Sequence, residues 1–342
     1  MKITIKQIAE ESGVSVTTVS NVINKKAHRV SADKIKLIES IMKKYNYTPN
    51  MNARSLVKSS SRLIGLLYYS ENERINFADP FVTEILEGIE KKAKEYGYFT
   101  LIHNITSVED VEAVQMNWKF EGFIAVGVSE SFFAAIDHKI QAPVIFIDTH
   151  LSEETKQEVK TSKWERCFIH TDDKKVGYQA TDYLANCGHE QIGFLSYPFK
   201  IDATGVIHSR FEGYKQALAE HGLQYDDRLS FTSFEFEKIV TQLDKITALV
   251  VTADFLAVEF IHYLKENHCY DPKHISIIGF DDIRYAKLMD PPLTTIRLDQ
   301  VRKGELAVDV LASRTKNKET EQEKNFILPG ELIERESVMK RT

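Results

Sequence analysis

The sequence has few cysteines, little glycine and proline, and no long apolar run. Its cysteines, Cys167, Cys187 and Cys269, lie far apart without Cys-x-x-Cys spacing, which fits neither a disulfide framework nor a zinc site and predicts small buried thiols. Only 15 Gly and 8 Pro in 342 residues exclude a low-complexity or collagen-like chain. With no apolar run of about 18 residues and no signal-peptide core, we expect a globular cytoplasmic protein with no membrane partner.

Sequence motifs of enzyme active sites are also missing. The chain has no Gly-x-Gly-x-x-Gly after a strand, no phosphate loop ending in Gly-Lys-Ser or Gly-Lys-Thr, and no His-Glu-x-x-His. Residues 127–131 (GVSES) lack the second glycine of a nucleophile elbow. We therefore expect no enzymatic activity, no metal site and no cofactor.

Charge is distributed unevenly along the chain. Residues 1–62 contain 12 Lys and Arg against 4 Asp and Glu, a net charge of +8, whereas the other 280 residues carry 32 against 46, a net charge of −14. A basic block suits a polyanion that the acidic remainder would repel, so two different roles are indicated. Nucleic acid is the first candidate partner of the basic part.

Three short helices are expected in the basic part, within residues 1–48. Thr4 and Gln7 form a capping box that begins the first helix, and Gly13 ends it. Ser15 caps a second helix that is apolar on one side, after a very short turn, and Ser31 caps a third. The third helix is expected to complete a small core with Ile35, Ile38, Tyr45 and either Ile41 or Met42. The spacing of the first two helices is that of a helix-turn-helix.

In a helix-turn-helix the second helix lies in the major groove, where short polar and methyl groups meet base edges. Val16, Thr17 and Asn21 are the expected base contacts, and Thr18, Asn24 and Arg29 are better placed for phosphates. The alternative is a small helical bundle with a solvated basic face.

Residues 49–62 read as a short helix started by Pro49 that continues into a serine-rich linker. A helix of one to two turns is marginal in water by itself, so it should fold only when something else orders it. This segment is therefore a candidate hinge that couples the basic part to the remainder.

These motifs together resemble the lactose-repressor and galactose-repressor family of bacterial transcription regulators. The resemblance is carried by residues 4–9 (TIKQIA), 13–15 (GVS), 18–20 (TVS), 22–24 (VIN), 29–31 (RVS), 47–50 (YTPN) and 53–56 (ARSL). It implies a homodimer whose hinge helices order on a palindromic operator, with Leu56 wedged into the minor groove. In the hinge it places DNA contacts at Ala53, Arg54 and Leu56.

From residue 63 onward, short apolar runs alternate with amphipathic stretches such as 80–96. This alternation predicts parallel sheets with helices on both sides, arranged as two doubly wound lobes. The family resemblance agrees, because it implies a body like a periplasmic sugar-binding protein whose chain crosses between lobes three times. We place the crossings near residues 174, 295 and 326, giving a first lobe of 63–173 and 295–325 and a second of 174–294 and 326–342. The expected strands are 63–69, 99–104, 122–126, 143–148, 166–170, 191–197, 248–252 and 275–280.

Ligands of open parallel sheets bind beyond the carboxyl ends of the strands, so the residues that follow the strands are candidates. Each aspartate there could equally be a helix N-cap, and only convergence with an arginine favours binding. The resemblance implies effector contacts at Phe81, Asp148, Arg210, Asp254 and Asp281, and Phe234 is a further candidate for an apolar wall. Ala253 and Gln300 depart from many relatives and leave the ligand open.

The expected function is therefore sequence-specific DNA binding by a repressor of carbohydrate-utilisation genes. A sugar or sugar derivative bound between the lobes would change its operator affinity. A purine or another metabolite is the alternative effector, and a stand-alone sugar-binding protein is the least favoured alternative, because it would not need the basic part. The final residues contain no leucine heptads, so a dimer is expected.

Overall fold

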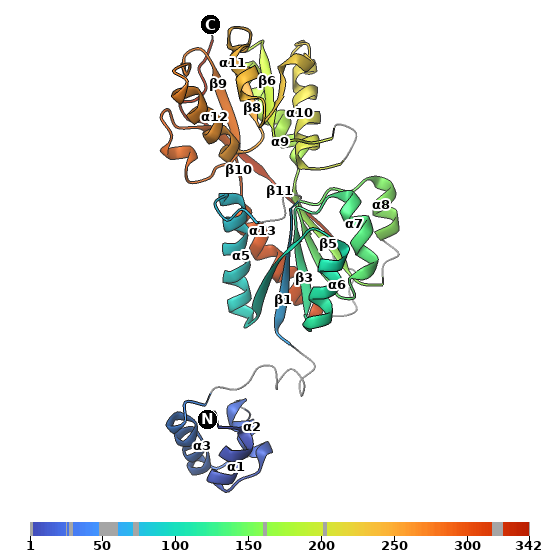
Figure 1. Ribbon diagram of the computed structural model, residues 1–342, viewed down its shortest axis with the longest axis vertical. Helices are drawn as coiled ribbons and strands as arrows, with labels where there is room; N and C mark the ends of the chain where they lie inside the picture. The colour runs from blue at the N-terminus through green and yellow to red at the C-terminus, as the bar shows by residue number, and fades with distance from the viewer. Residues whose placement is uncertain are drawn as a thin grey trace. The chain divides into compact units, whose positions relative to one another are not determined.

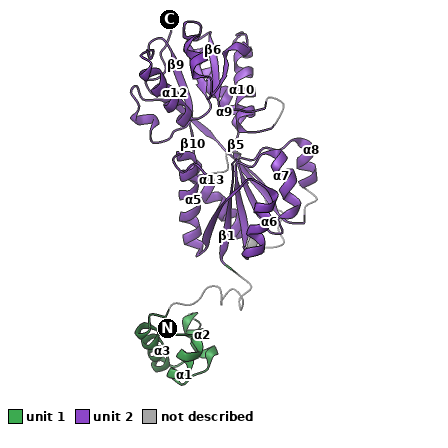
Figure 2. Ribbon diagram, in the orientation of Figure 1, with its two compact units in different colours: residues 1–61 green, residues 62–342 purple. Residues whose placement is uncertain are grey.

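The structure is a computed structural model that describes residues 3–24, 26, 30–47, 61–70, 75–159, 163–200, 204–316 and 324–341. The chain divides into two compact units, residues 1–61 and 62–342 (Figure 2). No helix within the described ranges is both long and apolar enough to cross a membrane. Most of the predicted hinge, including Ala53, Arg54 and Leu56, lies outside the described residues, as does Arg29.

The first unit contains the three predicted helices, α1 (Ile5–Ser12), α2 (Val16–Ile23) and α3 (Ala32–Lys44). The predicted capping box is confirmed, because the Thr4 hydroxyl accepts from the Gln7 amide and the Gln7 side chain accepts from the Thr4 amide. Gly13 ends α1 in the left-handed region, at φ 62°, as the tight turn requires. The Ser15 hydroxyl caps α2 by accepting from the Thr18 amide.

Two expectations for α3 were wrong. Ser31 occupies the N-cap position, but its side chain makes no capping hydrogen bond. Tyr45 was assigned to the core and is instead 43% exposed. The helix ends at Tyr45, so the helical spacing no longer applies, and the Tyr47 amide donates to the Met42 carbonyl. This turn brings Tyr47 onto the core in place of Tyr45.

The second unit contains two six-stranded sheets that define two lobes (Figure 1). The sheet of the first lobe is entirely parallel. Its strand order is β11 (Asn325–Leu328), β5 (Arg166–Thr171), β4 (Val144–Ile147), β3 (Gly122–Val126), β1 (Leu63–Tyr69) and β2 (Phe99–Ile105). The helices of this lobe are α5 (Pro80–Tyr96), α6 (Val108–Asn117), α7 (Glu130–Ile136), α8 (Glu153–Val159) and α13 (Gln300–Lys316), with the short 3₁₀ helix η1 (Asp137–Lys139).

The sheet of the second lobe repeats this topology, except that its edge strand, β12, is antiparallel to its neighbour. Its strand order is β12 (Gly330–Ile333), β10 (Thr294–Leu298), β9 (Ser276–Asp281), β8 (Ala248–Val251), β6 (Ile192–Ser196) and β7 (Ser230–Thr232). The helices are α9 (Asp173–Asn186), α10 (Val206–Glu220), α11 (Phe236–Val240) and α12 (Asp254–Glu266), with the 3₁₀ helices η2 (Asp227–Leu229), η3 (Leu243–Lys245) and η4 (Ala286–Leu288).

Alternate residues of each strand pack on opposite faces, which explains the nearly continuous apolar runs. In β1, Leu66 packs on the face covered by α5 and α13, whereas Leu67 packs on the face covered by α6 and α7. Burial on both faces requires apolar residues at successive positions. The predicted burial of the thiols is confirmed for Cys167 and Cys187, whereas Cys269 is only half-buried.

Each lobe contains a pair of helices held in very close contact by glycines. In the first lobe, a Cβ atom on Gly88 of α5 would lie 2.0 Å from the carbonyl oxygen of Val301 in α13. In the second lobe, a Cβ atom on Gly213 of α10 would lie 2.0 Å from the carbonyl oxygen of Lys174 in α9. These distances leave no room for any side chain. Both pairs carry residues of the candidate site described below.

The chain passes between the lobes three times, between β5 and α9, between β10 and α13, and between β11 and β12. The second and third crossings come a few residues later than the sequence placed them. Strand β10 pairs within the second sheet through Leu298, and β11 pairs within the first through Leu328. Residues 295–298 therefore lie in the second lobe and residues 326–328 in the first. A strand paired along its whole length cannot change sheets midway, so the crossings fall between elements.

Candidate functional site

The carboxyl ends of both sheets meet at one place, because the three crossings leave from the carboxyl ends of β5, β10 and β11. Side chains bridge the lobes there. The Thr204 hydroxyl donates to Glu130 Oε2 over 2.8 Å and to the His150 carbonyl over 2.9 Å. Carboxyl ends of parallel strands are where ligands of such folds bind. We call the residues gathered there, described next, the interlobe site.

Arg210 is the central cation of the interlobe site and is only 5% exposed. Its Nε donates to Asp173 Oδ1 over 2.9 Å, and another guanidinium nitrogen donates to the Thr252 carbonyl over 2.6 Å. The guanidinium also lies over the Phe280 ring, 4.5 Å from its centroid. Burial opposes ionisation of Asp173, but Arg210 and His150 together keep its pKa below the usual value.

Asp148 follows β4 and is held by a buried lysine of α13. Its backbone is left-handed, at φ 54°, and its two carboxylate oxygens accept from Lys303 Nζ over 2.8 and 2.9 Å. Lys303 is 1% exposed. The Lys303 ammonium is therefore neutralised inside the protein by a single carboxylate.

Asp281 ends β9, with φ 108°, and accepts from Gln300 Nε2 over 3.1 Å. Burial raises its pKa, while Arg210 and Lys303 act in the opposite direction. Arg210 and Lys303 therefore both act on Asp281, a residue that the strand-end pattern selected together with Asp148.

Asp254 differs from the prediction. It is completely buried, and its oxygens accept from the Ile283 amide over 3.1 Å and from the Thr295 hydroxyl over 2.8 Å. Gly279 lies so close that a Cβ atom there would be 2.0 Å from Asp254 Oδ1. Burial and the nearby Asp281 raise its pKa well above the usual value. Asp254 therefore packs beneath β9 and holds the loop after it, and the structure does not present it to a ligand.

The two predicted aromatic residues are placed differently. Phe81 lies in the first turn of α5, half-buried against the core of the first lobe, and its amide donates to Asp79 Oδ1 over 3.0 Å. Phe234 follows β7 and is 86% exposed. The structure therefore does not bring Phe234 against the Arg210 cluster.

Several buried polar atoms around these charges have no hydrogen-bond partner within the described part of the chain. They come from the carboxyl ends of four strands and from the start of α13, and are the hydroxyls of Thr149, Thr171, Ser196 and Thr252 and the Oε1 of Gln300. An unsatisfied buried polar atom costs about 1–3 kcal/mol, so a group of them at one place indicates a polar ligand.

Sequence reasoning missed three residues that hold the site together. Asp173 follows β5, so the rule that singled out Asp148 could have found it. His150, whose Nε2 lies 3.1 Å from Asp173 Oδ2, follows β4 by the same rule. Lys303 gave no signal, because a lysine on an amphipathic helix normally indicates a solvated face. No group of three or more His, Cys, Asp or Glu is placed to hold a metal ion in the ranges that the structure describes.

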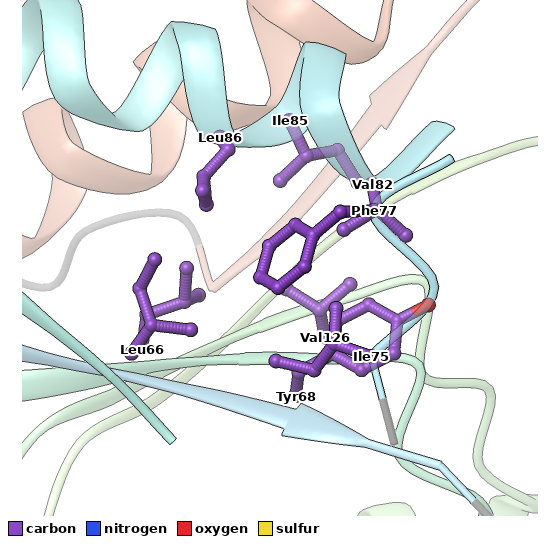
Figure 3. Close-up of a pocket in the computed structure, with 9 residues that line it drawn as sticks. Leu66, Tyr68, Ile75, Phe77, Val82, Ile85, Leu86 and Val126 are labelled. Atoms are coloured by element: carbon purple, nitrogen blue, oxygen red, sulfur yellow. The ribbon is translucent and has the colours of Figure 1, made fainter. Parts of the chain in front are cut away.

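A small apolar cavity lies inside the first lobe, between β1 and α5 (Figure 3). Its lining is almost wholly aliphatic and aromatic, and the residues are Leu66, Tyr68, Ile75, Phe77, Val82, Ile85, Leu86, Ile102 and Val126. Burial, with a contribution from Asp79, raises the pKa of the Tyr68 phenol to about 12. The cavity offers no polar groups comparable to those of the interlobe site, so we treat it as a packing feature.

In the first unit, α2 carries the predicted base-contacting residues, with Val16 and Thr17 in its first turn and Asn21 in its second. Val16 is 43% exposed, Thr17 is exposed and Asn21 is half-exposed. The Thr18 hydroxyl lies 2.9 Å from the Ser15 hydroxyl, and the side-chain Nδ2 of Asn24 donates to the Ser20 carbonyl over 2.7 Å. Val16 and Thr17 are therefore free to meet a partner surface, whereas Thr18 and Asn24 also support the helix.

Comparisons with known proteins agree with both units. Residues 4–50 match the model for bacterial regulatory proteins of the lacI family, and residues 181–338 match a periplasmic binding protein-like domain. The transcriptional repressor PurR of Vibrio campbellii is 30% identical over 351 residues, covering 98% of this chain and 99% of the relative. The chain belongs to the LacI family. It is thus a DNA-binding transcriptional regulator.

Other repressors and LacI-family regulators are similar to most of this chain. The ribose operon repressor of Haemophilus influenzae is 29% identical and covers 98% of both chains. The Lac repressor dimer bound to operator and the anti-inducer ONPF has a TM-score of 0.81 at 23% identity, covering 99% of this chain and 100% of that one. A LacI-family regulator from Enterococcus faecium with bound ribose has a TM-score of 0.67 at 23% identity, covering 82% of this chain and 100% of that one. The relatives named here by sequence are transcriptional repressors, not enzymes.

Proposed function

We propose that this LacI-family regulator is a repressor of carbohydrate-utilisation genes that binds a palindromic operator as a homodimer. Its operator affinity changes when a sugar or sugar derivative binds at the interlobe site. The group of unpartnered hydroxyls and the Gln300 amide oxygen carries this proposal, because hydroxyl groups of a ligand both donate to and accept from such atoms. The names of the ribose operon repressor and of the ribose-bound regulator support it. A relative's name, PurR, suggests the purine alternative.

The charge of the interlobe site favours a ligand without phosphate or carboxylate. Lys303 is already neutralised by both oxygens of Asp148, and Arg210 is paired with Asp173. An anionic ligand would have to compete with these buried pairs, and breaking such a pair costs several kcal/mol. The same cluster holds Asp281, which would repel an anion.

For DNA, we propose that Val16, Thr17 and Asn21 contact bases, and that Thr18, Asn24 and Arg29 contact phosphates. Ala53, Arg54 and Leu56 would bind at the centre of the palindrome. Effector binding would alter lobe closure and so the ordering of the hinge, with a coupling of about 1–3 kcal/mol, or about 5- to 150-fold in operator affinity. An inducer and a corepressor would use the same pocket and would differ only in which lobe arrangement each binds more tightly.

Two variants within residues 1–48 test the DNA-binding assignment. Their binding is measured on an operator selected in vitro from random sequences. Thr17→Ala is expected to relax discrimination at its contacted base pair by about 1–3 kcal/mol, because it loses a base contact. Arg29→Ala is expected to weaken binding to all sequences alike and to reduce the salt dependence, because it loses a phosphate contact. Fluorescence anisotropy over a salt series measures both effects. Equal affinity of the unmodified protein for selected and random DNA at moderate salt would contradict the proposal.

A further inference from the structure

The hydroxyl of Thr204, which belongs to the second lobe, lies between two acceptors of the first lobe. It is 2.8 Å from Glu130 Oε2, in the first turn of α7, and 2.9 Å from the carbonyl oxygen of His150, which follows β4. A hydroxyl donates a single hydrogen, and both acceptors belong to the first lobe. The hydrogen bond therefore joins the lobes whichever acceptor it favours. We call Thr204, Glu130 and the His150 carbonyl the interlobe bridge.

Glu130 is held in a fixed orientation by donors from residues 152–155, at the start of α8. Its Oε1 accepts from the Ser152 amide over 2.7 Å, from the Ser152 hydroxyl over 2.5 Å and from the Thr155 hydroxyl over 2.6 Å. Burial opposes ionisation of Glu130, but the hydrogen bonds from Ser152, Thr155 and Thr204 lower its pKa to about 2. The bridge thus ends on an oriented, charged carboxylate, and such charge-assisted hydrogen bonds are about twice as strong as neutral ones.

On the second lobe, Thr204 is tied closely to the helix that carries Arg210. A single residue, Gly205, separates Thr204 from α10, and its φ of 152° and ψ of 169° lie in a region that only glycine adopts readily. Arg210 lies in the second turn of the same helix. A movement of α10 that displaces Arg210 therefore also displaces Thr204 relative to Glu130.

On the first lobe, His150 connects the interlobe bridge with the charged groups of the interlobe site. Its carbonyl oxygen accepts from Thr204, and its side-chain Nε2 lies 3.1 Å from Asp173 Oδ2. Asp173 belongs to the second lobe and accepts from Arg210 Nε over 2.9 Å. Contiguous contacts of this kind can carry coupling between two places in a protein, and mutation measures that coupling. The interlobe bridge is therefore joined to Arg210 by contacts that involve both lobes.

The interlobe bridge lies away from the three crossings. The hydrogen bond from Gln300 to Asp281 also joins the lobes, but Gln300 begins α13, directly after the crossing from β10. Neither Glu130 nor Thr204 lies in an element that enters or leaves a crossing, and α7 and α8 lie to one side of the crossings in Figure 1. When two lobes rotate about the segments that connect them, the contacts farthest from those segments separate most. The interlobe bridge is therefore placed to resist opening.

We propose that the interlobe bridge is a latch that holds the two lobes closed over the interlobe site and so raises effector affinity. A ligand that contacts both lobes binds the closed arrangement, and its apparent affinity is proportional to the fraction of molecules in that arrangement. Loss of the bridge lowers this fraction without removing a contact to the ligand. This inference rests on the proposed function, because it specifies how the same site is held closed.

Thr204→Val removes the hydroxyl but keeps the shape of the side chain, and the ligand-free full-length protein provides the first test. The His150 side chain reports on lobe separation, because it is 14% exposed and its neighbour Asp173 belongs to the other lobe. Its modification by diethylpyrocarbonate, located by peptide mass spectrometry, is measured relative to that of His262, whose side chain is 70% exposed. His150 is expected to react about threefold faster or more in Thr204→Val, because the open fraction grows. An unchanged rate overturns the inference.

Two control variants separate the hydrogen bond from a packing effect. Thr204→Ser keeps the hydroxyl, and Thr106→Val removes a hydroxyl that donates to Asp110 Oδ2 over 3.1 Å within the first lobe. Both are expected to leave the His150 rate within about 1.5-fold of that in the unmodified protein. If Thr204→Ser reacts as fast as Thr204→Val, side-chain packing and not the hydrogen bond keeps the lobes together, which contradicts the latch.

Sugar binding provides the second readout. Isothermal calorimetry with D-ribose, D-glucose, D-galactose and maltose is expected to show that Thr204→Val weakens every sugar that binds by one common factor, about two- to tenfold. The factor is common because the closed fraction is a property of the protein. An unchanged affinity, or factors that differ among sugars, overturns the latch. If none of the sugars binds, the proposed sugar effector fails, whereas the His150 rate still decides the latch.

Discussion

The Arg210→Ala variant is expected to unfold at a markedly lower urea concentration than the unmodified protein, with a loss of about 3–5 kcal/mol in the free energy of unfolding. The substitution leaves the Asp173 carboxylate buried without its guanidinium partner and leaves the Thr252 carbonyl without a donor. It also removes the stacking on Phe280. Far-UV circular dichroism during a urea titration measures the loss, and thermal shift with a series of mono- and disaccharides should show no ligand-induced stabilisation in this variant.

Arg228→Ala is the matched control for this prediction. Arg228 also pairs with an aspartate, Asp226, over 2.7 Å, but its side chain is 80% exposed. Exposed pairs contribute little, so we expect a change within about 0.5 kcal/mol. Similar urea midpoints for the two variants would mean that Arg210 is not part of a buried charge network. A stable Arg210→Ala protein that still responds to a sugar would instead remove Arg210 from the site.

The Gly88→Ala variant is expected to destabilise the first lobe by about 1–3 kcal/mol or more. The added Cβ would lie 2.0 Å from the Val301 carbonyl oxygen and 2.9 Å from the Glu305 nitrogen, so α5 and α13 would have to separate. On an unobstructed helix, the same change would stabilise by about 0.4–1 kcal/mol, so the sign of the effect tests the contact. Because α13 carries Lys303 and Gln300, the displacement should also weaken effector binding.

Tryptophan fluorescence during urea unfolding reports on this lobe, because the two tryptophans, Trp118 and Trp164, both belong to it. Lys94→Ala, an exposed change on the same helix, is expected to shift stability by less than about 0.5 kcal/mol. Increased stability of Gly88→Ala would show that α5 and α13 are not in close contact.

Local sequence patterns predicted a helix or strand correctly where its capping residues or its apolar spacing lie within one short stretch of the chain. The capping box at Thr4, the apolar run of β1 and the span of α5 each depend on neighbouring residues, and the structure confirms them. Four short strands, β7, β10, β11 and β12, were not predicted. Their sequences mix polar with apolar residues, and their pairing partners are distant in the chain.

The residues of the candidate site also fall into two groups, those that a sequence rule places correctly and those that it does not. Asp148 and Asp281 could be selected from the sequence, because parallel strands bring their carboxyl ends to one edge, whereas Arg210 lies on α10 and was selected through the family resemblance. The same rule selected Asp254, yet it is buried beneath β9, since Gly279 leaves space for its carboxylate. The rule gives the edge at which a residue lies, but not the direction of its side chain.

The sequence by itself determined the division into a basic part, residues 1–62, and an acidic remainder. It also determined the helix-turn-helix and the alternation of strands and helices. Those features follow from charge, capping and periodicity within short windows. Only the tertiary structure decided which charges pair, that Lys303 neutralises Asp148, and that Gln300 donates to Asp281. These relations join residues of different lobes or distant helices, and their energies depend on burial and mutual distance, which arise only when the chain has folded.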